Sequence, residues 1–399
     1  MKIILMLKIN VKNRVIKNNK IVKKISFLVI IILIIYLSIY DKVISKTIQK
    51  KLAINFIKDM FKNHLNNNKL KESFNEYPNV SIIIPLYNCQ NSIQTSIASI
   101  QIQKFKNYEI ILINDHSLDN TSKIVNDIKE NDHRIKLINN KKNMGTLYSR
   151  SIGALNSKGK YIFCLDNDDL FYDENLFDKI FNIAESKDFD IVEFNSLDIK
   201  RFDIHLKLRE IRENSSNHHF YDYILFQPKL GIFPISKNNK YYPNDYHIWG
   251  KSIKTKIYKK AVNMLSEKNF SFYNCWTEDI SILFIIFNIA QSIIFTEVYG
   301  IIHLVYDQST TNTLHDSKKL MSEIFLLDII IKYIQDIEIN KSYLFHKLFF
   351  IMNSHYIQFM NIEHINYLNF LIKKMLQIKS LTEDEYKLLN KYMNILNAK

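Results

Sequence analysis

The sequence predicts an α/β fold in which a mostly parallel central sheet is flanked by helices. Between residues 79 and 194, short apolar runs alternate regularly with helical stretches. These runs contain few polar residues, as expected for strands buried on both faces of a parallel sheet that lies between helices. The predicted strands are 80–85, 108–113, 135–138, 161–165 and 190–194. The predicted helices between them are 92–103, 121–130, 145–156 and 173–185.

The net charge of +14 is unevenly distributed along the 399 residues. Residues 1–71 contain sixteen Lys and Arg residues and two acidic residues, while residues 72–399 contain 38 of each sign. A nucleic-acid-binding domain would carry its basic excess on the folded body. We therefore predict no nucleic-acid partner and assign the excess to an N-terminal attachment region.

A membrane segment is predicted at Ile25–Tyr40, which is uncharged and almost entirely apolar. Sixteen helical residues cover ~24 Å, enough for a single span of a thin bilayer. The alternatives are a cleaved signal peptide, for which DKVISKTIQKK offers no small-residue cleavage site, and a buried core helix. The sequence thus predicts a basic tail at 1–24, a transmembrane signal-anchor at 25–40 and a stem at 41–78.

The orientation of this segment follows from the flanking charges. Seven Lys and Arg residues lie within about twenty residues on its N-terminal side and five on the other side. This bias predicts a single-pass protein with a cytoplasmic N-terminus, and hence a folded body in the lumen of the Golgi or the endoplasmic reticulum, or outside the cell.

Polar motifs follow the predicted strands at their carboxyl ends, where α/β sheets bind ligands. In order, they are PLYN at 85–88, NDHSLD at 114–119, NMGTLYSR at 143–150 and DNDD at 166–169. An acidic turn alone is more simply explained as a helix cap. Four such motifs in this order, each after an apolar strand or at a helix start, favour a binding site.

This ordered set resembles the family 2 inverting glycosyltransferases of the GT-A fold, with their P-x-Y-N, D-D-x-S-x-D, N-x-G-x-x-x-x-R and D-x-D motifs. The resemblance covers about residues 79–310 and implies a GT-A nucleotide-sugar-binding domain at 79–311. It also implies a nucleotide-sugar donor, most simply UDP-linked, and Mn²⁺ or Mg²⁺ bound by carboxylates, since hard cations prefer oxygen ligands.

The resemblance assigns roles to individual residues. Asp168 would bind the metal, and Asp166 would contact the ribose, or the metal through water. Asp115 would accept a hydrogen bond from uracil, and Arg150 would face the pyrophosphate.

At the other end of the donor, Pro85 would end the strand beside the base and Tyr87 would flank the base. The turn after the second strand departs from the family pattern, because Asn114 replaces its first Asp and His116 replaces a glycine.

The resemblance also identifies an acceptor half. Glu278 and Asp279 match the E-D pair of the family, so Asp279 would be the general base and Glu278 would orient it or bind the acceptor. The alternative is a helix N-terminus capped by Thr277. Trp249 would form an acceptor platform by sugar stacking or, alternatively, belong to the core. His303 is either a further metal ligand or, as is more common for a lone histidine, structural.

Residues 312–399 are predicted to form amphipathic helices, including 322–337 and 365–378, and contain no motif that we can assign. The predicted function is a membrane-anchored glycosyltransferase that transfers one hexosyl or N-acetylhexosaminyl unit to a glycan or glycoconjugate hydroxyl with inversion. Two alternatives remain at this level, a dolichyl-phosphate sugar synthase and a non-catalytic sugar-nucleotide- or glycan-binding relative.

Overall fold

A computed structural model describes residues 48, 51–57, 77–200, 232–234, 247–266, 277–305, 316–333, 344–345, 348–349, 351–352, 360–378 and 381–398. The chain divides into two units, Met1–Ala53 and Ile54–Lys399, and the elements below belong to the second. The predicted span Ile25–Tyr40 and most of the predicted stem lie outside the described residues. Within the described ranges, no helix is both long enough and apolar enough to cross a membrane.

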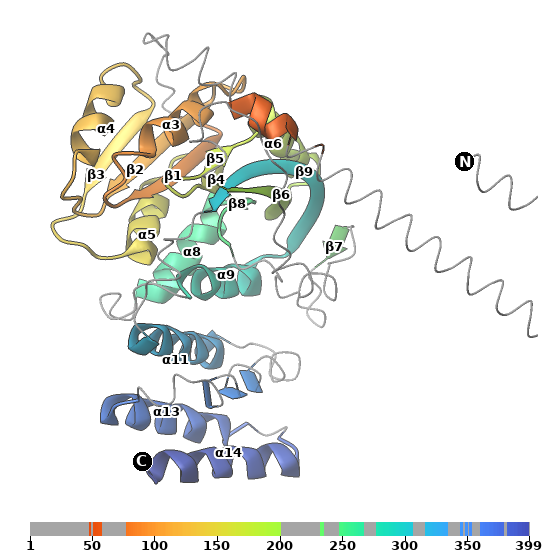
Figure 1. The fold of residues 1–399 in the computed structure, drawn as a ribbon. Coiled ribbons are helices and arrows are strands. Elements are labelled where there is room, and N and C mark those ends of the chain that lie inside the picture. The colour runs from red at the N-terminus through yellow and green to blue at the C-terminus, as the bar shows by residue number, and fades with distance from the viewer. Residues whose placement is uncertain are drawn as a thin grey trace, which may run out of the picture. The chain divides into compact units, whose positions relative to one another are not determined.

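The first half of the sheet is parallel, as predicted. Strands β1, β2, β3 and β4 pair in the order β3-β2-β1-β4, with Ile82 of β1 opposite Ile110 of β2 and Phe163 of β4. The elements are β1 Val80–Leu86, α3 Ile93–Gln101, β2 Tyr108–Asn114, α4 Thr121–Lys129, β3 Ile135–Asn139, α5 Thr146–Asn156 and β4 Tyr161–Cys164. Strands β1, β2 and β4 are buried along their whole length, because helices cover both faces of the sheet (Figure 1).

The second half of the sheet is mixed, which corrects the prediction of a mostly parallel sheet. Strand β8 lies antiparallel between β4 and β6, β6 runs parallel to β9, and β5 and β7 are antiparallel to β9. These elements are β5 Leu170–Phe171, α6 Leu176–Ser186, β6 Ile191–Lys200, β7 Ile232–Pro234, β8 Lys251–Lys254 and β9 Ser292–Val305.

Strand β8 has no apolar signature, because two of its four residues are lysines. Lys254 is nevertheless buried, since its ammonium group donates to Asp190 Oδ1 at 3.0 Å and to the Asp188 carbonyl at 2.7 Å. Lys251 is also buried and donates to the His247 carbonyl at 2.8 Å. Paired charges therefore replace the apolar side chains from which a buried strand is usually recognised.

The helices after β8 pack against one face of the sheet and continue into the C-terminal region. They are α8 Thr255–Ser266, α9 Glu278–Ile289, α11 Asp316–Tyr333, α13 Ile362–Met375 and α14 Glu383–Asn397. Figure 1 shows α11, α13 and α14 in successive layers beyond α8 and α9. Helix α9 is apolar on nearly all sides, as expected for a helix that is surrounded by others.

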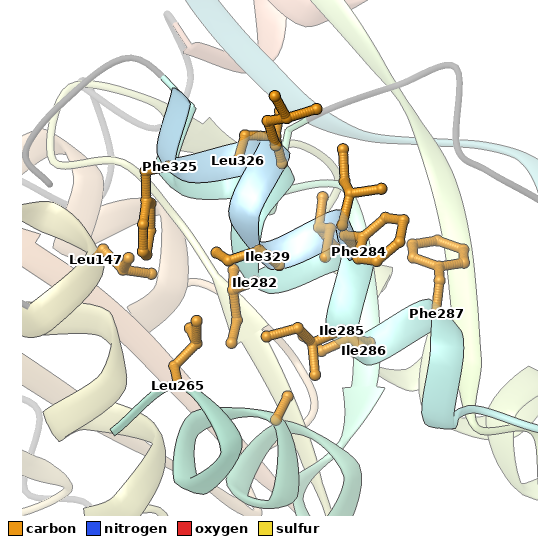
Figure 2. Packing of buried hydrophobic residues seen from close by; sticks show 14 of the residues in the cluster. Leu147, Leu265, Ile282, Phe284, Ile285, Ile286, Phe287, Phe325, Leu326 and Ile329 are labelled. Carbon is orange, nitrogen blue, oxygen red and sulfur yellow. The ribbon is translucent and has the colours of Figure 1, made fainter. Parts of the chain in front are cut away.

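One apolar cluster joins the helices that flank the sheet to the C-terminal helices. Leu147 of α5, Leu265 of α8, Ile282 of α9 and Phe325 of α11 all belong to it (Figure 2), and it extends to Leu396 of α14. A second cluster on the other face of the sheet joins β1, α3 and α6. The boundary predicted near residue 312 therefore does not separate two cores.

Candidate active site

The loops after β1 and β2 are tied together by hydrogen bonds. Asn88 Oδ1 accepts from the Leu118 amide at 2.8 Å, and the Gln90 amide donates to Asp119 Oδ2 at 3.0 Å. Tyr87 lies at the start of this pair of loops and is 46% exposed. Its ring is thus accessible at the sheet edge where the sequence predicts the nucleotide base.

Asp115 ties the end of β2 to the start of α5. Its carboxylate accepts from Asn140 Nδ2 at 2.8 Å, from the Met144 amide at 2.8 Å and from the Gly145 amide at 2.7 Å. The side chain is 4% exposed. Asp115 therefore positions the helix that carries Arg150, while its predicted contact with uracil stays a prediction.

The two departures from the family pattern in the β2 turn preserve its geometry. Asn114 Nδ2 donates to Asn139 Oδ1 at 2.9 Å, and Asn114 Oδ1 accepts from the Ser117 amide at 3.1 Å. His116 has φ 62°, in the left-handed region, which histidine enters more readily than most side chains do. The turn is thus retained without glycine.

The acidic turn after β4 lies beside the end of β1. Asn167 Nδ2 donates to the Pro85 carbonyl at 3.0 Å, which holds the turn against the predicted base site. Asp166 and Asp168 are partly exposed, whereas Asp169 is buried. Asp169 Oδ1 accepts from the Leu304 amide at 2.9 Å, and its Oδ2 has no hydrogen-bond partner in the part of the chain that the structure describes.

The charges around Asp169 oppose its ionisation. Burial raises the pKa of Asp169 well above its usual range; the nearby His303 opposes this effect, and Asp166 and Asp168 add to it. A cation bound beside the turn would relieve this repulsion. The residues present therefore fit a divalent ion.

The number of protein ligands limits how such an ion would be held. Among the described residues, no three His, Cys, Asp or Glu side chains are grouped as a metal site. Magnesium-type ions are commonly bound by one or two carboxylates together with substrate phosphate oxygens. Asp168 and Asp166 could be the carboxylates with which the protein binds such an ion.

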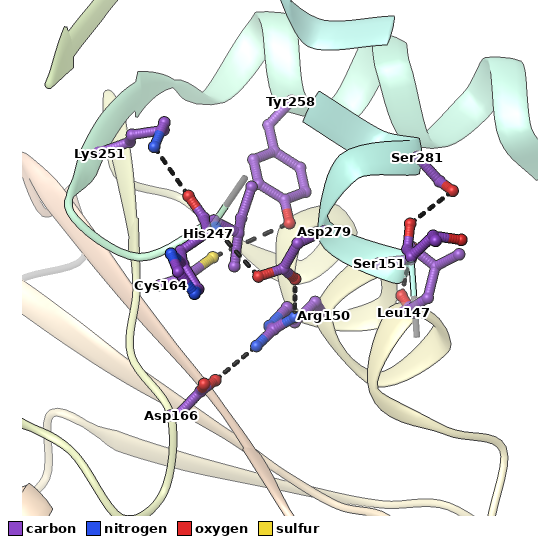
Figure 3. Close-up of polar contacts among 12 residues, drawn as sticks. Leu147, Arg150, Ser151, Cys164, Asp166, His247, Lys251, Tyr258, Asp279 and Ser281 are labelled. Carbon is purple, nitrogen blue, oxygen red and sulfur yellow. Dashed lines mark hydrogen bonds and ion pairs between the residues drawn. The ribbon is translucent and has the colours of Figure 1, made fainter. Parts of the chain in front are cut away.

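Arg150 connects the two predicted halves of the site. It is 3% exposed, and its guanidinium group forms ion pairs with Asp166 through Nη2 and with Asp279 through Nη1 (Figure 3). Burial acts to lower the pKa of Arg150, but Asp279 and Asp166 outweigh it and hold that pKa well above its usual range. Arg150 is therefore a permanent cation between two carboxylates that are 113 positions apart in the sequence.

Asp279, in the first turn of α9, is held at both carboxylate oxygens. Oδ1 pairs with Arg150 and Oδ2 accepts from the Ile248 amide at 2.9 Å. Burial raises the pKa of Asp279, and the adjacent Arg150 opposes that rise. Burial and the neighbouring Asp279 raise the pKa of Glu278 to about 7, against the opposing effect of Arg150. The E-D pair is thus electrostatically distinct from solvent-exposed carboxylates.

Trp249 does not offer an open ring face. It is 3% exposed and its ring stacks on His247 with centroids 4.2 Å apart and an interplanar angle of 18°. His303 lies next to the same ring, with centroids 5.4 Å apart, and its Nδ1 is 3.1 Å from Asp198 Oδ1. These contacts favour the core alternative for Trp249 over the predicted acceptor platform.

Two features of this site have no signature in the sequence. His247 was not singled out because a lone histidine before a tryptophan has no recognisable spacing. Thr277 was considered only as a cap, but its side chain makes no capping hydrogen bond and instead donates to the Ser322 carbonyl of α11 at 2.8 Å. A helix cap can be recognised from neighbouring residues, whereas this contact joins elements 45 residues apart.

Comparisons with known proteins agree with this architecture. Residues 81–248 match the family model described as "Glycosyl transferase family 2". An uncharacterized glycosyltransferase of Rickettsia conorii is 40% identical over 32% of this chain and 19% of its own length. The Escherichia coli protein named UDP-Glc:alpha-D-GlcNAc-diphosphoundecaprenol beta-1,3-glucosyltransferase WfaP is 38% identical over 28% of this chain and 43% of its own length. The chain therefore spans less than half the length of each of these curated relatives.

Solved structures show the same fold over a longer stretch. The structure of S. aureus TarS 1-349 in complex with UDP-GlcNAc superposes with a TM-score of 0.55 at 15% identity, over 79% of this chain and 88% of that one. The complex of TarS 1-349 with UDP gives a TM-score of 0.53 at 14% identity, over 80% and 86% of the two chains. The family match, together with this shared fold and the ordered motifs at the strand ends, identifies residues 81–248 of the chain as a glycosyltransferase family 2 domain.

Proposed function

We propose that this protein transfers a single sugar from a UDP-linked donor to a hydroxyl group of a glycan or glycoconjugate acceptor, with inversion at the anomeric carbon. The observation that carries this proposal is the ion-pair bridge from Asp166 through Arg150 to Asp279, which brings the donor motif and the E-D pair into one site. TarS structures in complex with UDP and UDP-GlcNAc, and the name of WfaP, support a UDP-sugar donor. The sugar unit is a hexose or an N-acetylhexosamine.

The donor binds at the carboxyl edge of β1, β2 and β4. Tyr87, with its exposed ring, lies against the base, and Pro85 and Asp115 shape the wall behind it. Arg150 faces the diphosphate. Asp168, with Asp166 as its neighbour, would hold Mn²⁺ or Mg²⁺, which when bound would supply positive charge to stabilise the departing diphosphate.

The acceptor hydroxyl reacts beside Asp279. Its proton passes to an Asp279 carboxylate oxygen while an oxygen lone pair forms the new bond to the anomeric carbon. The bond from that carbon to the diphosphate breaks, and its electron pair leaves on the diphosphate oxygen. Attack from the face opposite the leaving group produces inversion, and Glu278 orients Asp279 or contacts the acceptor.

The proposal is tested by incubating the protein with a panel of UDP-sugars, candidate acceptors and Mn²⁺ and measuring UDP release and glycan product. Asp279→Asn preserves shape and should lower transfer by about 10²- to 10⁴-fold. Unchanged turnover in this variant would exclude Asp279 as the base. Asp384→Asn, on exposed helix α14, is the matched control and should keep full activity.

The metal assignment has a separate test. Chelation and Asp168→Ala should each weaken the binding of UDP in the presence of Mn²⁺, measured by calorimetry. Full binding and full transfer after both treatments would show that Asp168 does not hold a required metal.

We further propose that residues 25–40 anchor the protein in a membrane, with a cytoplasmic N-terminus and a lumenal catalytic domain. The apolar length and the flanking lysines of this segment support the proposal. Protease treatment of sealed vesicles should leave the catalytic domain intact. Digestion of the catalytic domain in the absence of detergent would show that the protein has the opposite orientation.

A further inference from the structure

Arg150 is shared between the donor side and the base side of the site. Its Nη2 pairs with Asp166, which follows β4, and its Nη1 pairs with Asp279, which opens α9. Figure 3 shows the guanidinium group lying between these two carboxylates, which approach it from different sides. One buried cation therefore links two elements that contribute to different steps of the proposed reaction.

The guanidinium group has unused binding capacity. A guanidinium group has five N–H donors in a rigid planar fork. The Nε of Arg150 is buried and has no hydrogen-bond partner among the described residues. Phosphate oxygens are strong, geometrically matched partners for such a fork. A diphosphate arriving beside Asp166 thus meets a cation that can turn towards it.

This rearrangement affects Asp279, because the guanidinium group is rigid. Turning one edge of the fork towards a diphosphate moves Nη1 away from Asp279 Oδ1. Asp279 Oδ2 remains bound to the Ile248 amide at 2.9 Å, so the carboxylate keeps its position. The exchange therefore frees one oxygen of a carboxylate that stays in place.

We propose that Arg150 couples donor binding to the general base: the guanidinium group that pairs with Asp279 is drawn to the donor diphosphate, which exposes Asp279 Oδ1 to the acceptor hydroxyl. This inference rests on the proposed function. Arg150 is a positioning residue in this scheme, because it acts on the acceptor proton only through Asp279. The coupling also favours binding of the donor before productive binding of the acceptor.

Competition for Arg150 has a measurable consequence for nucleotide binding. If Asp279 and the diphosphate compete for one guanidinium group, then removing the Asp279 charge should strengthen nucleotide binding. For the full-length protein in detergent with Mn²⁺, we expect Asp279→Asn to bind UDP about 5- to 10-fold more tightly than wild type, measured by calorimetry. GDP is titrated alongside UDP, so that binding of a second nucleoside diphosphate is measured as well.

A double-mutant cycle separates this coupling from a general loss of negative charge. In an Arg150→Gln background, Asp279→Asn should change UDP affinity by less than about 2-fold, because the shared cation is gone. At pH 8, where Glu278 is mostly ionised, Glu278→Gln removes a neighbouring charge that forms no ion pair with Arg150, and should have a smaller effect than Asp279→Asn. Arg150→Met, which also removes the shared cation, provides the same cycle if Arg150→Gln does not fold.

The outcomes are distinct. Equal UDP affinity in wild type and Asp279→Asn overturns the coupling. A gain in UDP affinity from Asp279→Asn that persists in the Arg150→Gln background also overturns it. Failure of wild type to bind any nucleoside diphosphate overturns the proposed function itself. Neither turnover nor knowledge of the acceptor is needed for this decision.

Discussion

At the scale of single residues, Glu278 makes the stability of the folded protein depend on pH. Its pKa is raised to about 7 from an ordinary 4.5, first by burial and then by Asp279. The folded protein therefore holds a proton on Glu278 between pH 4.5 and about 7 that the unfolded chain has lost. The stabilisation that Glu278 contributes is therefore fully present below pH 4.5 and is lost as the pH rises to about 7.

We predict that Glu278→Gln reduces this loss of stability, because an amide does not titrate. The measurement is the urea midpoint of wild type and variant at pH 5 and pH 8. Wild type should lose more stability than the variant between these two pH values. Identical pH dependence in the two proteins would show that Glu278 is ionised throughout.

At the scale of elements, Thr277 joins the start of α9 to α11. The Thr277 hydroxyl donates to the Ser322 carbonyl at 2.8 Å, and both residues are 2% exposed. Asp279 lies two residues further along the same helix. A helix from the region without recognised motifs therefore supports the helix that carries the E-D pair.

We predict that Thr277→Val lowers kcat while the KM for the donor stays near its wild-type value, and that Thr277→Ser retains activity. Valine has a similar shape but cannot donate to Ser322, which costs about 1 kcal/mol of stability. Ser281→Ala is a matched control, because among the described residues that hydroxyl donates to the Thr277 carbonyl at the start of its own helix, at 2.7 Å, and not to α11. Equal activity of the Val and Ser variants would remove the proposed support.

Helix α5 is held against the sheet at Gly153. A Cβ atom added there would lie 2.5 Å from Ile83 Cγ2 and 2.9 Å from Ile113 Cδ1. Both contacts are with buried side chains of the parallel strands. Any larger residue must therefore shift these side chains or the helix that also presents Arg150.

We predict that Gly153→Ala destabilises the protein by about 1–3 kcal/mol through overpacking and also lowers transfer. Ile83→Ala creates space at the same contact. The double variant should consequently be less destabilised than the sum of the two single variants, measured by urea unfolding. Strict additivity would show that the destabilisation by Gly153→Ala does not come from its contact with Ile83.

At the scale of the whole molecule, the C-terminal helices share a core with the catalytic domain. Leu326 and Leu368 are fully buried in the cluster that includes Ile83 of β1 and Leu147 of α5. Removing residues 312–399 would expose the face of α9 that packs on α11 (Figure 2). Burial of that apolar face is a major source of stability.

We predict that Ile54–Lys399 unfolds in one cooperative transition and that a chain ending at residue 311 does not. The shorter chain should bind a hydrophobic dye and lack a sharp melting transition. Removal of Met1–Ala53, which forms a separate unit, is the control and should leave the transition of the remainder unchanged. A cooperative transition in the shorter chain would show that the first 311 residues hold an independent core.

Local sequence patterns were sufficient for the parallel half of the fold. Strands β1 to β4 and helices α3 to α5 lie close to their predicted positions, because their apolar periodicity reports burial directly. Because the ends of these strands could be predicted, the motifs that follow them could also be assigned to the carboxyl edge of the sheet. Strand β8 has no apolar signature because its lysines form ion pairs with acidic residues of other segments and donate hydrogen bonds to backbone carbonyls.

The sequence by itself determined the alternation of strands and helices, the charge-neutral body and the residue types that make up the site. Only the tertiary structure decided that Arg150 joins Asp166 to Asp279, that Trp249 stacks on His247, and that the C-terminal helices complete the core. Periodicity depends on neighbouring residues, so it can be seen in a single sequence. Ion pairs and packing between distant segments depend on how the chain folds back on itself, and no local spacing encodes them.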